Sequence, residues 1–211
     1  SALEVAKVLK FPQSSTSSLM RTMTALGYLQ YDGSSRTYLP TARVSLLGHW
    51  LSPTLFKSGR LLNLMEDLAE QTGETILVGI RNGLSAQYIH IIQARLEMRL
   101  YVRPGTLRPL TRSGLGLALL AEYPDREVRR IVRRLNDVGP PPGGQVEVDD
   151  LLATLNEVRA KGHALSLNLV TPGAGVVAMR LPAIAELAEP MAICVGGLTE
   201  KLVEQEKDFA R

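Results

Sequence analysis

The chain has 211 residues, 45% of them hydrophobic and 21% charged, a composition typical of globular proteins whose length allows one large domain or two unequal ones. Its single cysteine, Cys194, excludes an intrachain disulfide framework and indicates a reducing compartment, which we expect to be the cytoplasm. No apolar run approaches the roughly 18–20 residues of a membrane-spanning helix and no signal peptide is recognisable, so we expect no membrane partner.

The excess positive charge of the chain is confined to its first quarter. Residues 1–50 contain five basic and two acidic side chains, whereas residues 51–211 contain 19 of each sign. Such a modest asymmetry is only a weak indication of nucleic acid binding by itself. It gains weight from the elements predicted in the same segment.

Two short helices are predicted within the first 27 residues. The apolar pattern of residues 2–9 is helical and ends before Pro12, because proline disfavours helix at the residue that precedes it. A second helix begins in the hydroxyl-rich run after Gln13 and ends at Gly27, a common stop residue. Its exposed face is predicted to carry small hydrogen-bonding side chains.

A hairpin is predicted next, with strands at 28–31 and 36–39 around an Asp32-Gly33-Ser34-Ser35 turn. Helix, turn, helix and basic-tipped hairpin is the order of a winged helix-turn-helix, which places one helix in the major groove and the hairpin on the flanking backbone. We therefore predict a DNA-binding unit over residues 1–43, with double-stranded operator DNA as its partner. The alternative is a small α/β cap with a solvated serine-rich face. The predicted DNA contacts are Gln13, Ser14, Ser15, Thr16, Ser17, Ser18, Arg21, Thr22 and Arg36.

Residues 44–59 are predicted to form a linker helix that is interrupted at Pro53. This segment is too apolar for an exposed linker, so we expect it to contribute to a dimer interface, which a dyad-symmetric operator requires. Its large apolar side chains are Leu46, Leu47, Trp50, Leu51, Leu55 and Phe56.

Residues 60–211 mix strands and helices in an order that predicts an α+β domain, a sheet with helices packed against it. A helix closed by Gly73 is followed by strands at 75–81 and 86–93, which Asn82-Gly83 marks as a hairpin. The other predicted elements are strands at 98–102, 175–181 and 190–196, helices at 113–122, 126–135 and 149–161, and a charged terminal helix.

A Gly-rich helix start, Ser113-Gly114-Leu115-Gly116, is the main candidate for ligand chemistry. Backbone N–H groups at the positive end of a helix dipole attract a carboxylate or phosphate. Arg108 and Arg112 flank this turn, and an arginine fork suits a carboxylate. The alternative is a tight packing turn with surface arginines.

No catalytic or metal constellation is predicted. The three histidines, His49, His90 and His163, have no ligand spacing, so the sequence predicts neither an enzyme nor a cofactor. Cys194 lies in an apolar strand, which favours a buried small hydrophobe over a redox sensor.

Several stretches together resemble the IclR family of bacterial transcriptional regulators over essentially the whole chain, with the first helix of the family's DNA-binding domain absent. Each stretch alone is weak, but their order and spacing are specific. They are Phe11–Thr16 with Ala25–Leu29, Asp67–Thr75, Pro104–Leu110 with Ser113–Gly116 and Ala118–Leu120, Gly175–Ala178 and Ala192–Gly197.

The resemblance implies a GAF-like effector-binding domain over residues 60–211 and homodimers or homotetramers on palindromic operators. It further implies a ligand-responsive regulator, usually a repressor and sometimes an activator. The alternative is a small-molecule sensor that acts through protein partners without reading DNA.

The chain departs from the family at positions that often present polar groups to a ligand. Cys194 and Gly196 on the last strand, and Val177 on the strand before it, predict a less polar pocket. We expect the effector to be a small organic acid, or else an aromatic compound. The predicted effector site comprises Leu100, Arg108, Gly114, Leu115, Asn168, Val177, Cys194 and Gly196.

Overall fold

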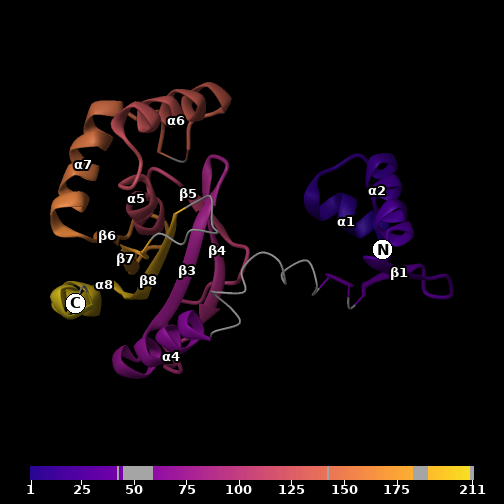
Figure 1. Cartoon of the computed structure of the whole chain (residues 1–211), viewed down its shortest axis with the longest axis horizontal. Coiled ribbons are helices and arrows are strands. Elements are labelled where there is room, and N and C mark those ends of the chain that lie inside the picture. The colour runs from indigo at the N-terminus through magenta and orange to yellow at the C-terminus, as the bar shows by residue number, and fades with distance from the viewer. Residues whose placement is uncertain (42, 45–58, 142, 183–189, 210–211) are drawn as a thin grey trace. The chain divides into compact units, whose positions relative to one another are not determined.

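The structure, a computed structural model, describes residues 1–41, 43–44, 59–141, 143–182 and 190–209 (Figure 1). It divides into two compact units, Ser1–Ser58 and Gly59–Arg211. The linker helix predicted over residues 44–59, including all six of its large apolar side chains, lies outside the described residues except at its two ends. No helix in the described part of the chain is long and apolar enough to cross a membrane.

The N-terminal unit consists of two helices followed by a two-stranded antiparallel sheet. Its elements are α1 (Ala2–Leu9), α2 (Gln13–Ala25), β1 (Leu29–Asp32) and β2 (Thr37–Pro40). Between the helices, Lys10 turns left-handed at φ 54° and Pro12 stands just before the first residue of α2. Both strands begin one residue later than predicted, because the Tyr28 N–H still donates to the Met23 carbonyl at the helix end and Arg36 belongs to the turn at φ 53°.

The C-terminal unit is built on a six-stranded antiparallel sheet in the order β5-β4-β3-β8-β7-β6. The hairpin predicted at Asn82-Gly83 joins β3 to β4, with Gly83 at φ 61°. The two short edge strands, β5 and β6, were not predicted. The strands are β3 (Thr75–Asn82), β4 (Ser85–Ile92), β5 (Leu107–Pro109), β6 (Ala164–Leu167), β7 (Ala174–Arg180) and β8 (Met191–Leu198).

Residues 98–102 were predicted as a strand, and this prediction is wrong. They run as an extended segment outside the sheet, and side chains take the place of a neighbouring strand. Thr75 Oγ1 donates to the Leu100 carbonyl at 2.8 Å, and Gln93 Nε2 donates to the Val102 carbonyl. Leu100 and Val102 are buried while the residue between them is exposed. Alternation of buried and exposed side chains shows that one face of an extended segment is buried. It does not show that the segment is hydrogen-bonded to a neighbouring strand.

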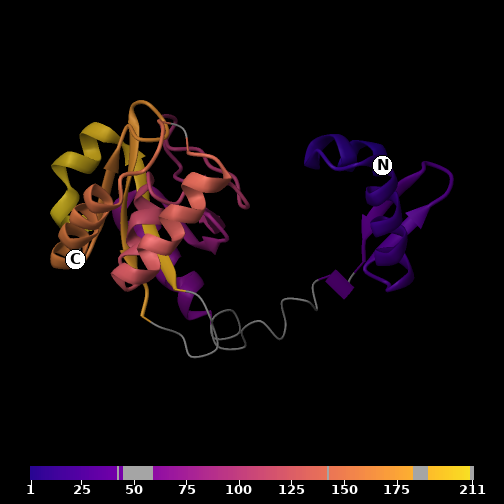
Figure 2. The same cartoon turned by 90° about the horizontal axis from the view of Figure 1, so that it is seen from above.

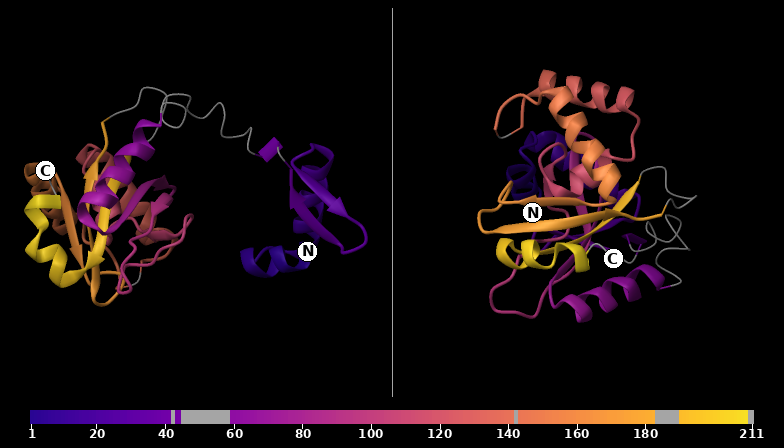
Figure 3. Two further views of the ribbon diagram at one scale, coloured as in Figure 1. Left: turned by 90° about the horizontal axis from the view of Figure 1, so that it is seen from below. Right: turned by 90° about the vertical axis from the view of Figure 1, so that its left-hand side faces the viewer.

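Helices cover both faces of the sheet (Figures 2 and 3), so the predicted α+β arrangement is confirmed for this unit. One face carries α5 (Gly114–Leu120), α6 (Asp125–Val138) and α7 (Val148–Lys161), and the main apolar core lies beneath them. The other face carries α4 (Arg60–Thr72) and α8 (Thr199–Glu204), which α9 (Glu206–Phe209) follows. All seven residues of α5 are buried. Gly116 permits this close packing, because a Cβ there would lie 2.0 Å from the Leu110 carbonyl oxygen.

Candidate functional site

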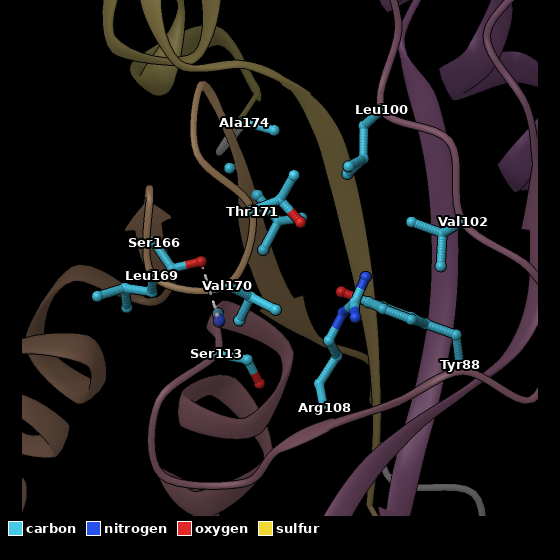
Figure 4. A pocket seen from close by; sticks show the side chains of 13 residues that line it. Tyr88, Leu100, Val102, Arg108, Ser113, Ser166, Leu169, Val170, Thr171 and Ala174 are labelled. Carbon is cyan, nitrogen blue, oxygen red and sulfur yellow. Dashed lines mark hydrogen bonds between the residues drawn. The ribbon is translucent and has the colours of Figure 1, made fainter. Parts of the chain in front are cut away.

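A pocket opens in the C-terminal unit between the start of α5, the turn from β6 to β7 and the extended segment that includes Leu100 (Figure 4). About 30 Å³ of it is open to the centre of a water-sized sphere. One ordered water needs roughly 10–15 Å³ in that measure, so the pocket has room for about two or three waters. A larger ligand therefore requires a wall to move. The lining residues are Tyr88, Leu100, Val102, Arg108, Ser113, Gly114, Ser166, Leu169, Val170, Thr171, Ala174, Gly175 and Val176.

Arg108 is the one charged residue among those that line the pocket. It comes from β5, and its guanidinium lies beside the hydroxyl of Tyr88, which β4 contributes (Figure 4). Tyr88 is 3% exposed. Burial raises the pKa of the Tyr88 phenol well above its ordinary value, the nearby Cys194 adds to this, and Arg108 opposes it. The phenol is therefore neutral at physiological pH and can donate a hydrogen bond together with the guanidinium.

The amides at the start of α5 are already bonded within the protein. The Gly114 N–H donates to Ser166 Oγ at 3.0 Å, and the Gly116 N–H donates to Ser113 Oγ at 3.2 Å. A Cβ at Gly114 would lie 2.5 Å from Val176 Cγ2. The prediction that the Gly114 amide receives a ligand carboxylate is therefore wrong, because a serine 52 residues away accepts from it. The turn packs tightly, as the alternative predicted, but its two flanking arginines are half-buried and do not lie on the surface.

Two other predicted features of this turn lie away from the pocket. Leu115 is fully buried and packs against β3, where a Cβ at Gly79 would come within 2.4 Å of Leu115 Cδ2. Arg112 donates to the carbonyls of Gly144 and Gln145, at 3.2 and 3.3 Å. Arg112 thus joins the loop before α7 to the turn between β5 and α5, and it does not line the pocket.

Asn168 shapes the pocket without lining it. It adopts φ 57° at the end of β6, and its Oδ1 accepts from the Gly173 N–H at 2.7 Å and from Thr199 Oγ1 at 3.4 Å. These bonds close the turn of residues 169–173, whose first three side chains form one wall. Asn168 was predicted to bond the ligand, and its amide oxygen is instead occupied by the turn and by the start of α8.

The three predicted positions on the last two strands also lie outside the lining. Neighbouring residues of a strand point to opposite faces, so Val177 faces away from the pocket that Val176 lines. Cys194 is 1% exposed within the core, and burial raises the pKa of its thiol above the usual range, as expected for a buried small hydrophobe. Gly196 affects the pocket through Leu100, because a Cβ at position 196 would lie 2.6 Å from Leu100 Cδ2 and would displace this lining side chain.

Of the eight predicted effector residues, Leu100, Arg108 and Gly114 are thus brought together. Four polar residues of the lining, Tyr88, Ser113, Ser166 and Thr171, were not among the predicted effector residues. Alternation along β4 places Tyr88 and Ala86 on the inner face, and this signal could have been used. Ser166 carried no comparable signal, because β6 was not predicted.

In the N-terminal unit, most of the predicted DNA contacts lie on the surface. Ser17 is half-buried. Thr16 is 2% exposed and its Oγ1 donates to the Pro12 carbonyl at 3.0 Å, so its side chain belongs to the inner face of α2 and the prediction is wrong for this residue. Met20, one turn later, is buried on the same face. The exposed members are Gln13, Ser14, Ser15, Ser18, Arg21, Thr22 and Arg36.

The turn of the hairpin is ordered around Asp32. Its carboxylate accepts from the Ser34 N–H at 2.9 Å and from the hydroxyls of Ser34 and Ser35, both at 2.6 Å. The hydrogen bonds that Ser34 and, to a smaller extent, Ser35 donate lower the pKa of Asp32 to about 2. The only acid of the turn is therefore held by its own loop, and Arg36 stands exposed beside it.

Comparison with known proteins identifies relatives for most of the chain. A family model described as "Bacterial transcriptional regulator IclR C-terminal" matches residues 59–211. The chain is 28% identical over 162 residues to the HTH-type transcriptional regulator KdgR of Escherichia coli (strain K12), covering 76% of this chain and 61% of that protein. It is 26% identical over 186 residues to the HTH-type transcriptional regulator BhcR of Paracoccus denitrificans (strain Pd 1222), covering 83% and 63%. The chain therefore spans about three fifths of the length of these curated relatives.

Solved structures agree with these matches. The effector domain of the regulator IclR from Acinetobacter sp. ADP1 is 30% identical with a TM-score of 0.66, over 75% of this chain and 91% of that chain. The IclR family transcriptional regulator from Brucella abortus aligns over 99% of this chain and 78% of that chain, with a TM-score of 0.70. At 24% identity this second likeness bears on the fold alone.

Proposed function

This chain belongs to the IclR family of bacterial transcriptional regulators, and from that premise we propose that it binds operator DNA through residues 1–43 and senses a small organic acid in the pocket around Arg108. The family and the relatives named above are regulators, not enzymes. The observation that carries the effector part is the lone guanidinium of Arg108 in a pocket otherwise lined by hydroxyls and apolar groups.

The order of elements in the N-terminal unit supports DNA binding. Two helices and a hairpin in the succession α1, α2, β1, β2 are typical of a winged helix-turn-helix, in which α2 would enter the major groove. Ser14, Ser18 and Arg21 are exposed and spaced so that they share one face of α2. Arg36, exposed at the hairpin turn, would meet the flanking backbone. The described part of α2 contains no acidic side chain to oppose this contact.

The pocket favours a short monocarboxylate over a bulky or neutral effector. Arg108 can form charge-assisted bonds with a carboxylate, each worth about 1.5–3 kcal/mol, and the neutral Tyr88 hydroxyl can add another donor. Leu100, Val102 and Val176 leave apolar surface for a small hydrocarbon body. An aromatic effector fits the dimensions of this pocket less well, because only about two or three waters have room there.

A thermal-shift screen tests this part directly. The probes are two- and three-carbon 2-oxo and 2-hydroxy acids, each paired with its neutral amide. An acid present at 100 times its Kd stabilises the folded state by about 2.7 kcal/mol. We expect the shift to vanish in Arg108→Met and to persist in Arg103→Met, which removes an exposed arginine outside the pocket. Equal shifts with acids and amides, or a full response of Arg108→Met, would contradict carboxylate recognition.

We further propose that the protein acts in the cytoplasm as a homodimer or homotetramer and usually represses its targets. A symmetric operator needs at least two copies, since each presents one α2. Light scattering on the full-length protein at micromolar concentration tests this, and a stable monomer would contradict it. The alternative sensor that acts only through protein partners would enrich no duplex from a random-sequence DNA pool.

A further inference from the structure

A hollow in the N-terminal unit lies between the second half of α2 and the hairpin. It is lined by Arg21, Thr24 and Ala25 from α2 and by Tyr31 and Tyr38 from the two strands. The tyrosines are direct cross-strand partners, and their ring centroids are 4.7 Å apart at an interplanar angle of 44°. Tyr31 is 45% exposed, so the hollow opens to solvent and the rings do not form a closed core.

The hollow gathers three side chains whose hydrogen-bond donors have no partner among the described residues of the protein. Within the described residues, the Arg21 guanidinium and the hydroxyls of Tyr31 and Tyr38 have neither a hydrogen-bond acceptor nor an ion-pair partner. The other polar lining residue, Thr24, is already satisfied, because its Oγ1 donates to the Met20 carbonyl at 2.9 Å. No acidic side chain lines the hollow. Three unused donors, one of them cationic, fit a small anion.

The hollow also continues the predicted DNA-reading face. Residues 14, 18, 21 and 25 recur at helical spacing, so the exposed Ser14 and Ser18 lie on the same face of α2 as Arg21 and Ala25. A duplex that follows this face toward the end of the helix meets the tyrosine pair next. A recognition helix contacts base edges mainly with its N-terminal residues, so its later turns would lie nearer the sugar-phosphate backbone.

We propose that Arg21, Tyr31 and Tyr38 bind a phosphate of the operator backbone and so set the register of α2 in the groove. This inference rests on the proposed DNA-binding function. The guanidinium supplies a charge-assisted bond and the two hydroxyls donate to the remaining phosphate oxygens. Such a contact carries no base information, and it acts by positioning the helix that reads the bases.

If the tyrosines only pack the hairpin against α2, phenylalanine would serve equally well. Tyr31→Phe and Tyr38→Phe therefore remove the proposed contact and keep the rings. Tyr28→Phe is the matched control, because that ring lies under the Arg43 guanidinium, 5.3 Å from it, and does not line the hollow.

The experiment uses the full-length protein and a duplex enriched by wild type from a random-sequence pool. We expect Tyr31→Phe and Tyr38→Phe each to raise Kd about threefold to tenfold without changing its salt slope. Arg21→Ala should raise Kd and reduce the slope by about 1, and Tyr28→Phe should match wild type. Methylphosphonate placed at single backbone positions of the duplex should abolish the tyrosine effect at one position per half-site.

Two results would overturn the inference while DNA binding stands. One is a Tyr31→Phe/Tyr38→Phe double variant that binds within twofold of wild type. The other is a tyrosine effect that persists on every methylphosphonate duplex. Failure of the wild-type protein to enrich any duplex would instead remove the proposed DNA-binding function, and this inference with it.

Discussion

The ammonium of Lys201 lies 2.7 Å from the carboxylate of Glu74, whose side chain is only 4% exposed. The same ammonium donates to the Thr72 carbonyl at 3.2 Å, so α8 is fastened to the end of α4 and the start of β3. Gly197 makes room for this pair, because a Cβ there would lie 2.5 Å from Glu74 Oε2. At the start of the same helix, Thr199 bonds Asn168 in the pocket turn. One short helix thus contacts both the turn that forms a wall of the pocket and the end of α4.

Removing the cation should therefore destabilise the C-terminal unit. Lys201→Met leaves the Glu74 carboxylate buried without a partner. Breaking a fully buried pair costs about 3–5 kcal/mol, and we expect about 1–3 kcal/mol here because Lys201 is 35% exposed. Urea unfolding followed by circular dichroism measures the loss. Lys161→Met, an exposed lysine at the end of α7, is the control, and equal stability of the two variants would refute a role for the pair.

Asn168 should matter through both its backbone and its side chain. Its φ of 57° is tolerated by asparagine and glycine, and its Oδ1 accepts two hydrogen bonds. Asn168→Ala loses both features and should destabilise by about 1–3 kcal/mol, whereas Asn168→Gly recovers the backbone and should cost less. Thermal unfolding ranks them. Residues 169–171 form a wall of the pocket, so we expect both variants also to weaken binding of the acid that stabilises wild type. A higher melting temperature for Asn168→Ala than for Asn168→Gly would contradict the backbone argument.

The thiol of Cys194 should be unreactive in the folded protein. It is 1% exposed, and burial raises its pKa above the ordinary value, so little thiolate exists near pH 8. We expect iodoacetamide to label the native chain far more slowly than the chain in urea, with mass spectrometry as the readout. Rapid labelling without denaturant would show that the last strand is accessible and would reopen a redox role.

The hairpin turn should lose its order only in strong acid. The pKa of Asp32 is lowered to about 2 from 3.8 by the hydrogen bonds that Ser34 and Ser35 donate. A lowered folded-state pKa contributes stability that is fully present above the unfolded value and is lost as the pH falls from about 4 through about 2. The Ser34 amide resonance should follow this titration, and Asp32→Asn should abolish it. A midpoint near 4 would mean that the carboxylate is not held by the turn.

The sequence by itself determined the order and type of most elements. Helical periodicity, the stop residues Gly27, Gly73 and Gly162, and the Asn82-Gly83 hairpin are local signals, and the corresponding elements formed within a few residues of their predicted bounds. Two of the predicted effector residues, Arg108 and Leu100, line the pocket, and their role in binding an effector stays a prediction.

Only the tertiary structure decided which groups face the pocket and which are already bonded. The Gly114 amide was predicted to be free, and Ser166 from an unpredicted edge strand accepts from it. Val177 lies on the face of the sheet opposite to the pocket, because it directly follows Val176 on β7 and consecutive side chains of a strand point to opposite faces. Thr16 turned inward with Met20 although its neighbours are exposed. These outcomes depend on strand register and on partners dozens of residues away, and neither is encoded in the local periodicity from which the elements were predicted.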